Sequence, residues 1–447
     1  MKRSFQKSWE KLMVFLAYAS PFLFPLYLLR FKVYGIPFTV LEAFCYLFFA
    51  VFLLAVLLNV QKINWAQPAR WYYLGAFVLL LGATLGVITA PHYIALPSGI
   101  IMDSQQAALG VWKGWLMAPM LYFFTFTQVI NHPEKLKKLL LNFVYAGALV
   151  SLSAYFWGIF NHGFTYDFRL SGFFESANYL SLYIGPPLLL GVYYMLHGDT
   201  LNKRVKLLNL ASVTIMIHAL FLTQSYAAVI AVFGALGLYM LVLLIRYKIG
   251  LKKLLLALTG LVVVFAVIVG SQWNSRKFQQ FIDFENRSSS TVRLEIYEVA
   301  VGLVNEYPLS GVGPGLFQGF YQSEGPEILG RAPMEWNIPH PHNEFLAFWL
   351  NAGLLGLLAF LGFLVLAHIR LTYPVIALWG IVIHGFFDTP FWKNDLAMIF
   401  WIVIGAILIL QTYGSTASKK PAAPIRKRLG ISRRSSTRTR KLKSKVR

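Results

Sequence analysis

The side chains best suited to acid–base chemistry gather in one polar stretch, from about Ser271 to Asn343. The stretch closes on Pro339-His340-Pro341-His342-Asn343. An imidazole, with an ordinary pKa near 6.5, suits proton transfer at neutral pH, so His342 is a candidate general base and His340 a candidate assistant. Asn343 is a good helix N-cap, which predicts that His342 lies just before a helix begins. Two histidines at this spacing also fit an exposed pair or an adventitious metal site, and the motif alone leaves these readings open.

A second motif in the same stretch favours binding of an anion. Ser288-Ser289-Ser290-Thr291-Val292-Arg293 opens an amphipathic run that continues to about Asn305. Ser290 or Thr291 is a natural N-cap, which predicts that Arg293 lies in the first helical turn. Unpaired N–H groups there, with a guanidinium beside them, would bind phosphate. The alternative is an ordinary surface helix with one arginine facing water.

Two shorter polar segments could complete such a site. Arg169 stands in the loop before the apolar stretch at 175–196, and the turn His384–Asp395 contains Asp388 and Lys393. Interfacial aromatic belts explain the Trp and Phe residues of that turn, but they do not explain His384, Asp388 or Lys393. The sequence contains neither a nucleotide P-loop nor a Gly-x-Ser-x-Gly elbow.

The elements that position these residues are apolar helices. With 57% apolar and 13% charged residues and a mean hydropathy of +0.59, the composition is that of an integral membrane protein. A membrane-spanning helix needs about 20 apolar residues. The pattern predicts an all-α, polytopic bundle of about twelve transmembrane helices. The expected spans are 11–29, 39–60, 71–90, 109–130, 139–160, 175–196, 206–222, 224–246, 252–270, 343–367, 371–387 and 395–412.

This pattern divides the chain into four parts. Residues 1–270 carry the first nine helices, 271–342 form a large extracytoplasmic loop or lid, 343–412 carry three more helices, and 413–447 form a basic, disordered tail. The tail supplies thirteen Lys and Arg and no acid to the formal net charge of +22. A cytoplasmic tail beside anionic lipid explains this charge better than nucleic-acid binding, because no groove-reading motif accompanies it.

The distribution of Lys and Arg predicts the orientation of the bundle. Short segments on one side hold seventeen, and those on the other side hold four. By the positive-inside rule, both termini are cytoplasmic, the chain resides in the cytoplasmic (inner) membrane, and 271–342 lies outside. The lone Cys45 excludes a disulfide framework.

In their order along the chain, these motifs resemble the O-antigen ligase and O-antigen polymerase family of membrane glycosyltransferases. The resemblance covers roughly residues 160–410 and rests on the ordered set of motifs rather than on any one of them. The motifs are Arg169-Leu-Ser-Gly-Phe-Phe with Asn178, Leu222-Thr-Gln-Ser225, Arg293, Pro308-Leu-Ser-Gly-Val-Gly-Pro-Gly315, His342-Asn343-Glu-Phe-Leu346 and Asn351-Ala-Gly353-Leu-Leu-Gly356.

The resemblance implies a GT-C-like helix bundle whose large outer loop caps a cavity open to lipid. Its members transfer a glycan from an undecaprenyl-diphosphate carrier to an acceptor hydroxyl without metal, nucleotide or other cofactor. A functional histidine of the family matches His342, and its diphosphate-binding arginines match Arg293 and Arg169. The family often has Ser-Arg where this chain has Ser225-Tyr226. Either Arg169, Arg287, Lys113 or Lys393 replaces that arginine, or the diphosphate is held differently.

We therefore expect His342 to deprotonate the acceptor for direct, inverting attack on the anomeric carbon, with His340 or Asp388 assisting. The expected binding residues for diphosphate or substrate are Arg293, Arg169, Arg287, Lys393, Asp388 and Asn343. The acceptor could be a glycan, a lipid or a protein. The alternative functions are a lipid or polysaccharide transporter and a non-catalytic component of envelope assembly.

Overall fold

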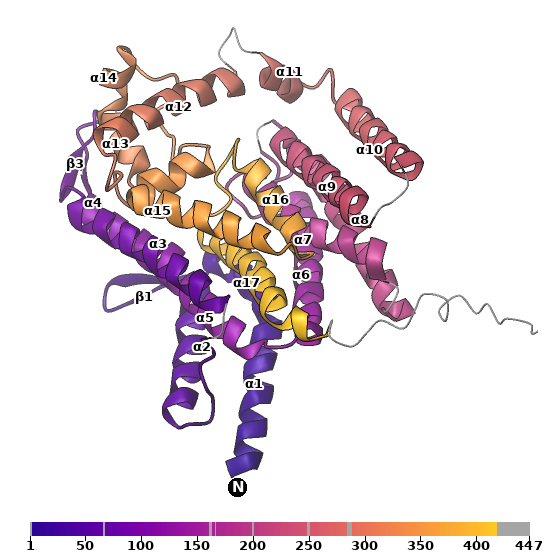
Figure 1. Cartoon of the computed structure of the whole chain (residues 1–447). Coiled ribbons are helices and arrows are strands. Elements are labelled where there is room, and N and C mark those ends of the chain that lie inside the picture. Colours follow the sequence, from indigo (N-terminus) through magenta and orange to yellow (C-terminus); the bar gives the residue numbers. More distant parts are fainter. Residues whose placement is uncertain are drawn as a thin grey trace, which may run out of the picture.

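The computed structural model describes residues 2–65, 68–160, 163–165, 167–198, 201–247, 251–283 and 288–417. The described chain is mostly helical (Figure 1). The long helices are α1 (Lys2–Leu23), α2 (Val40–Leu57), α3 (Ala69–Thr89), α6 (Pro133–Phe160), α7 (Ala177–His197), α8 (Lys203–Thr223), α9 (Tyr226–Tyr247), α10 (Leu251–Ser271), α15 (Glu344–Ile369) and α17 (Asn394–Ala417). Shorter bundle helices are η1 (Phe24–Leu28), α4 (Ser104–Val111), η2 (Trp112–Met117), α5 (Ala118–Val129) and α16 (Val375–His384).

The remaining elements lie in loops. Helices α11 (Arg276–Ile282), α12 (Ser289–Glu306), α13 (Phe317–Ser323) and α14 (Gly325–Leu329) belong to the long polar stretch. Two antiparallel hairpins pair β1 (Arg30–Val33) with β2 (Ile36–Thr39) and β3 (Tyr93–Ala95) with β4 (Ile101–Asp103). Because these strands are short and the rest of the described chain is helical, the prediction of an all-α, polytopic bundle is confirmed.

Fewer helices than expected are regular spans. Within the described ranges, nine helices are long and apolar enough to cross a membrane, or ten if α10 and α11 count as one span bent by 112°. The expected span at 109–130 is divided among α4, the π-helical η2 and α5. The expected span at 371–387 contains only the ten-residue α16, which rises about 15 Å against a hydrocarbon core of about 30 Å. Helix α17 extends to Ala417, so the expected tail begins later than 413, and residues 418–447 lie outside the described part.

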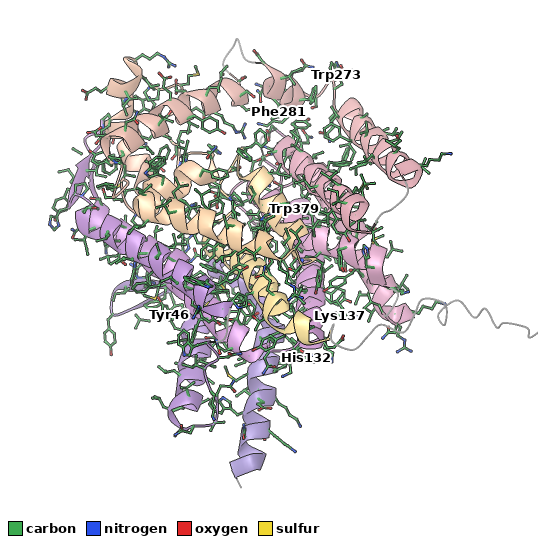
Figure 2. All side chains as sticks on the ribbon, viewed as in Figure 1. Tyr46, His132, Lys137, Trp273, Phe281 and Trp379 are labelled. Carbon is green, nitrogen blue, oxygen red and sulfur yellow. The ribbon has the colours of Figure 1, made fainter. Side chains whose placement is uncertain are left out.

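The connections alternate between the two ends of the bundle. The end that carries residues 272–283 and 288–343 is called the loop face, and α12 and α13 lie across it at the top of Figure 1. Trp273 and Phe281 mark this end in Figure 2, whereas His132 and Lys137 lie at the other end, called the opposite face. The described residues 163–165 and 167–176 and the segments 224–225 and 385–393 also lie between helices at the loop face. The segments that carry the predicted site residues therefore reach one end of the molecule.

Helix α17 is the central element of the bundle. From Leu396 to Ile409, each of its apolar side chains is no more than 2% exposed. A helix that is apolar on all sides is typical of the interior of a membrane bundle. The Trp401 ring packs on Phe123 at a centroid distance of 4.5 Å and on Phe363 at 5.3 Å. This contact joins α17 to α5 and α15.

A break in α15 connects the bundle to the loop face. Gly353 has φ +64°, and the backbone groups around it bond to the turn between α12 and α13 instead of to the helix. The Leu350 carbonyl accepts from the N–H groups of Val312 (2.8 Å) and Gly313 (3.1 Å), and Leu354 N–H donates to the Leu309 carbonyl (3.0 Å). The Asn351-Ala-Gly353 motif is thus the docking point of the turn that contains Val312 and Gly313.

We expect Gly353→Ala to destabilise the protein. A Cβ at this position would lie 2.1 Å from the Leu309 carbonyl oxygen, and φ +64° is strained for alanine. Steric overlap and backbone strain together predict a loss of about 2–4 kcal/mol. Thermal unfolding of the detergent-solubilised protein measures this loss as a lowered midpoint. The matched control is Gly362→Ala in the same helix, where a Cβ meets nothing within 4 Å. Equal midpoints for both variants would contradict the docking role of Gly353.

Candidate functional site

His342 occupies the position that its sequence predicts. The side chain of Asn343 caps α15 by accepting hydrogen bonds from the N–H groups of Phe345 (3.0 Å) and Leu346 (3.1 Å). His342 immediately precedes the cap and has φ +47°, a backbone conformation that is uncommon for a residue other than glycine. Tyr297 on α12 supports this backbone, because its hydroxyl lies 3.0 Å from the His342 carbonyl oxygen and donates to it. Both α15 and α12 therefore fix the histidine.

The imidazole of His342 faces a buried carboxylate. Its Nδ1 lies 3.4 Å from Oδ1 of Asp388, a residue that is 2% exposed in the loop between α16 and α17. Burial alone would raise the pKa of Asp388, but the imidazoles of His342, His340 and His384 outweigh it and hold this pKa well below its ordinary range. An ionised carboxylate that faces Nδ1 favours the tautomer with its proton on Nδ1, which leaves Nε2 of His342 free to accept a proton.

His340 adjoins this pair as a neutral group. The His340 and His342 ring centroids are 4.4 Å apart, and His340 Nδ1 lies 3.8 Å from Oδ1 of Asp388. Burial, followed by the neighbouring His342, lowers the pKa of His340 to about 3. Its Nε2 lies 3.2 Å from the hydroxyl of Tyr179 on α7. An imidazole that stays neutral at physiological pH can position its neighbours but cannot supply a cation.

Asn178 connects Arg169 to the same carboxylate. Arg169 is 7% exposed, and its Nη2 donates to Oδ1 of Asn178 at 2.6 Å. The amide nitrogen of Asn178 in turn donates to Oδ2 of Asp388 at 3.3 Å. Arg169 Nε donates to the Thr223 carbonyl at 2.7 Å, which fixes the guanidinium at the junction of α8 and α9. The structure thus brings Arg169, Asp388 and His342 into one network.

Arg293 also reaches this network, although its helix begins two residues earlier than expected. The prediction that Ser290 or Thr291 is the N-cap is wrong, because Ser288 caps α12 in a capping box with Thr291. Arg293 is therefore the fifth residue of α12 and lies beyond its first turn. Its guanidinium donates to the carbonyls of Phe387 (3.3 Å) and Ser289 (3.0 Å). Ser288 already accepts hydrogen bonds from two N–H groups at the start of α12, so this helix end does not offer them to a phosphate. The cationic group at this place is instead the Arg293 guanidinium, which lies beside the loop that carries Asp388.

Lys393 lies at the edge of the site on the α7 side. Its ammonium, 5% exposed, lies 3.7 Å from Oε2 of Glu175 and 3.8 Å from the centre of the Tyr179 ring. The expectation that Lys113 could replace the missing arginine finds no support here. Its ammonium binds the Glu42 carboxylate and donates to the Pro37 carbonyl at 2.6 Å. Arg287 lies outside the described residues.

Lys277 is a further cation near this site, and no sequence motif predicts it. Lys277 is half-buried on α11, next to Ser275, whose hydroxyl lies 3.1 Å from the Tyr226 hydroxyl. Burial lowers the pKa of the Lys277 ammonium to about 8, and the charges of Arg169 and Arg293 act in the same direction. Lys277 therefore lies within electrostatic range of both arginines. Only its place among the charges of the polar stretch could have drawn attention to it.

The described residues also contain one donor set that suits a metal ion. Ligand atoms of His340, His342 and Asp388 all lie within 4.8 Å of one another.

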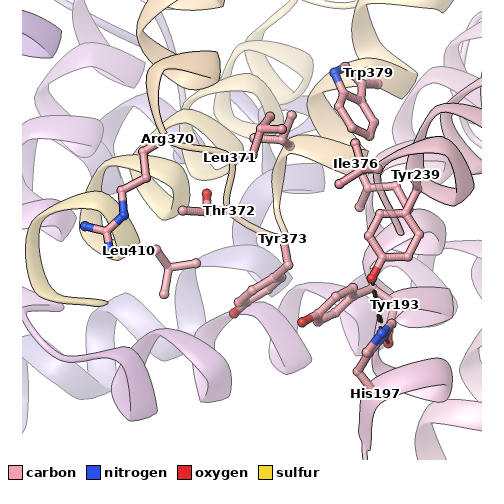
Figure 3. A pocket seen from close by; sticks show the side chains of 12 residues that line it. Tyr193, His197, Tyr239, Arg370, Leu371, Thr372, Tyr373, Ile376, Trp379 and Leu410 are labelled. Atoms are coloured by element: carbon pink, nitrogen blue, oxygen red, sulfur yellow. Dashed lines mark hydrogen bonds between the residues drawn. The ribbon is translucent and has the colours of Figure 1, made fainter. Parts of the chain in front are cut away.

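Two cavities lie away from His340 and His342. One, of about 320 Å³, opens at the opposite face, where Tyr193 and Tyr373 stack at 4.5 Å and the Tyr239 hydroxyl lies 3.2 Å from His197 Nε2 (Figure 3). None of the predicted site residues lines it. The other, of about 570 Å³, is apolar and lies among α7, α8, α9 and α10, with Phe221 in its lining. This second cavity approaches the site through α8.

Comparison with known protein families gives one match. A family model described as O-antigen ligase matches residues 211–361, which include Arg293, His340 and His342. The matched range excludes Arg169 and Asp388. A search of curated proteins found no match.

The matched domain and the apolar helices identify a multi-pass membrane protein that transfers glycans in the synthesis of envelope polysaccharide. Residues 211–361 therefore form an O-antigen ligase domain, which supports membership of that family.

Proposed function

We propose that this protein transfers or polymerises a glycan from an undecaprenyl-diphosphate donor onto an acceptor hydroxyl at the outer face of the cytoplasmic membrane. The observation that carries the proposal is the pairing of His342 with the buried Asp388 carboxylate, at 3.4 Å, beside Arg169 and Arg293. A base directed by a carboxylate and a cationic surface for a leaving group are the two requirements of glycosyl transfer from a diphosphate.

In the proposed step, the proton and the leaving group depart in opposite directions. His342 Nε2 takes the acceptor proton while the acceptor oxygen forms a bond to the anomeric carbon. The bond from that carbon to the diphosphate oxygen breaks, and the configuration inverts. The electron pair leaves with the diphosphate, whose added charge is stabilised by Arg169, Arg293 and Lys277. The proton on His342 then passes to solvent or to the departed diphosphate.

The apolar cavity among α7, α8, α9 and α10 supports a lipid-linked donor. It lies on the loop-face half of α8, where Phe221 lines it. Two residues later, the Thr223 carbonyl accepts from Arg169. A polyprenyl chain in this cavity would bring its diphosphate to Arg169. The excess of Lys and Arg in the short segments on the expected cytoplasmic side, seventeen against four in the short segments on the other side, supports placing the loop face outside the cytoplasm.

We expect His342→Ala to abolish transfer while the protein stays folded. Loss of a general base predicts a decrease in kcat of about 10²–10⁴-fold. The assay incubates purified protein with a defined undecaprenyl-diphosphate glycan and candidate acceptors. Mass spectrometry of the products then measures the decrease. The matched control is His132→Ala on the opposite face, which should transfer at the wild-type rate. Unimpaired turnover of His342→Ala would exclude the assignment and favour a transporter or assembly role.

A double variant tests whether Asp388 acts through His342. Asp388→Asn removes the charge that orients the imidazole, so we expect its kcat to fall at least about tenfold. In the His342→Ala background the same change should lower the rate little further, because the two residues act as a unit. If the loss of kcat in the double variant equals the product of the two single losses, Asp388 has a role independent of His342, such as contact with substrate.

Lys277 gives donor binding a predictable pH dependence. Since its pKa is about 8, Lys277 is protonated below pH 7 and loses its charge as the pH rises through 8. We therefore expect the KM for the donor to rise about three- to tenfold between pH 7 and pH 9. Lys277→Arg, which stays charged, should remove this rise, and Lys277→Ala should show a high KM at both pH values. Parallel pH profiles for wild type and Lys277→Arg would rule out the contact with diphosphate.

A further inference from the structure

The two histidines and the aspartate of the site share a geometry that the proposed reaction does not require. His342 Nδ1 and His340 Nδ1 both face Oδ1 of Asp388, at 3.4 and 3.8 Å. Base catalysis by His342 uses only one of these approaches. The second imidazole directs the same kind of nitrogen at the same oxygen.

Both nitrogens are buried and face Oδ1 of Asp388, but neither makes a hydrogen bond to a described residue. Among the described residues, Nδ1 of His340 and Nδ1 of His342 have no hydrogen-bond partner of acceptable geometry and are closed to solvent. Buried polar atoms are nearly always satisfied, and an orphaned one costs about 1–3 kcal/mol. Two orphaned nitrogens around one buried carboxylate indicate that a ligand completes the group.

The spacing fits a transition-metal ion. Zinc binds imidazole nitrogen and carboxylate oxygen at about 2.0–2.1 Å, so tetrahedral neighbours lie about 3.4 Å apart. The two Nδ1–Oδ1 distances of 3.4 and 3.8 Å are within a few tenths of an ångström of this spacing, and all three ligand atoms lie within 4.8 Å of one another. Two imidazoles and one carboxylate favour zinc and similar divalent ions over magnesium or calcium, which prefer oxygen ligands alone.

Neighbouring side chains already orient two of these ligands. The Asn178 amide donates to Oδ2 of Asp388 at 3.3 Å, which directs Oδ1 toward the histidines. The Tyr179 hydroxyl lies 3.2 Å from Nε2 of His340, so its Nδ1 is left for the metal. Such outer partners of metal ligands fix the tautomer and the ring orientation.

We propose that His340, His342 and Asp388 bind one zinc-class divalent ion, and that its binding inhibits glycan transfer. The inhibitory part rests on the proposed function. With the metal on Nδ1, His342 carries its proton on Nε2 and cannot accept a proton from the acceptor hydroxyl. The metal also takes the Asp388 oxygen that otherwise orients the imidazole. Because Arg169 and Arg293 lie nearby, the affinity for a dication should be moderate, so that the metal exchanges with chelators.

The first experiment measures metal binding without activity. The full chain, purified without a histidine tag and stripped with a chelator, is titrated with Co²⁺ and, in competition with a chromophoric chelator, with Zn²⁺. We expect one ion per chain and the visible absorption of four-coordinate Co²⁺. His340→Ala and Asp388→Asn should both lose this spectrum, and His132→Ala should keep it. Absence of one-to-one binding, or a spectrum that His340→Ala leaves unchanged, would overturn the site without touching the proposed function.

The second experiment measures transfer at saturating Zn²⁺, with each variant compared with its own zinc-free rate. We expect at least a tenfold decrease for wild type, reversed by EDTA, and no zinc-dependent decrease for His340→Ala. Stimulation by Zn²⁺, or loss of wild-type activity on chelation alone, would overturn both the inhibitory role and the metal-independent base. If His342→Ala keeps full transfer while Co²⁺ still binds wild type, the proposed mechanism fails and the metal site stands.

Discussion

The Asp388 carboxylate, only 2% exposed, carries the charge to which the rest of the site is fitted. Removing an ionised carboxylate from water costs several kcal/mol unless hydrogen bonds and opposite charges replace the solvent. Here Thr389 N–H donates to Oδ1 at 2.9 Å and the Asn178 amide donates to Oδ2 at 3.3 Å. The imidazoles of His340 and His342 complete the compensation. Changing any one of these groups therefore changes the free energy of the others.

The buried position of Asp388 follows from the shortness of α16. Ten residues rise about 15 Å, which is half the hydrocarbon thickness, so the loop 385–393 begins inside the protein rather than above it. Thr389 and Phe391 in this loop are both fully buried. Irregular backbone at membrane depth is tolerated where protein encloses it. The same irregularity makes a dry site in which the carboxylate can act strongly on an imidazole.

Local chemistry accounts for what the sequence predicted, and long-range packing accounts for what it did not. Apolar length indicated the helices, and the side-chain chemistry of Asn343 indicated where α15 begins. The cap of α12 was misplaced because the Ser289 and Ser290 hydroxyls donate to the Gln280 and Phe281 carbonyls of α11, which leaves Ser288 as the cap. Apolar composition gave no sign that the expected span at 371–387 holds only a ten-residue helix. The bond from Asn178 to Asp388 joins residues 210 positions apart, beyond the reach of any local pattern.

Tyr226 shows how packing can replace a missing charge. The family resemblance leads one to expect an arginine at this position, but the Tyr226 ring packs on Phe278 at 5.3 Å and Phe281 at 5.4 Å. Its hydroxyl meets Ser275, the N-cap of α11. These contacts hold α11 against the start of α9, and Lys277 is part of α11. Lys277 lies on a loop helix rather than on a membrane helix, so its position in the site depends on the position of α11. If Lys277 contacts the donor, the docking of α11 against the bundle and the binding of the diphosphate stabilise each other.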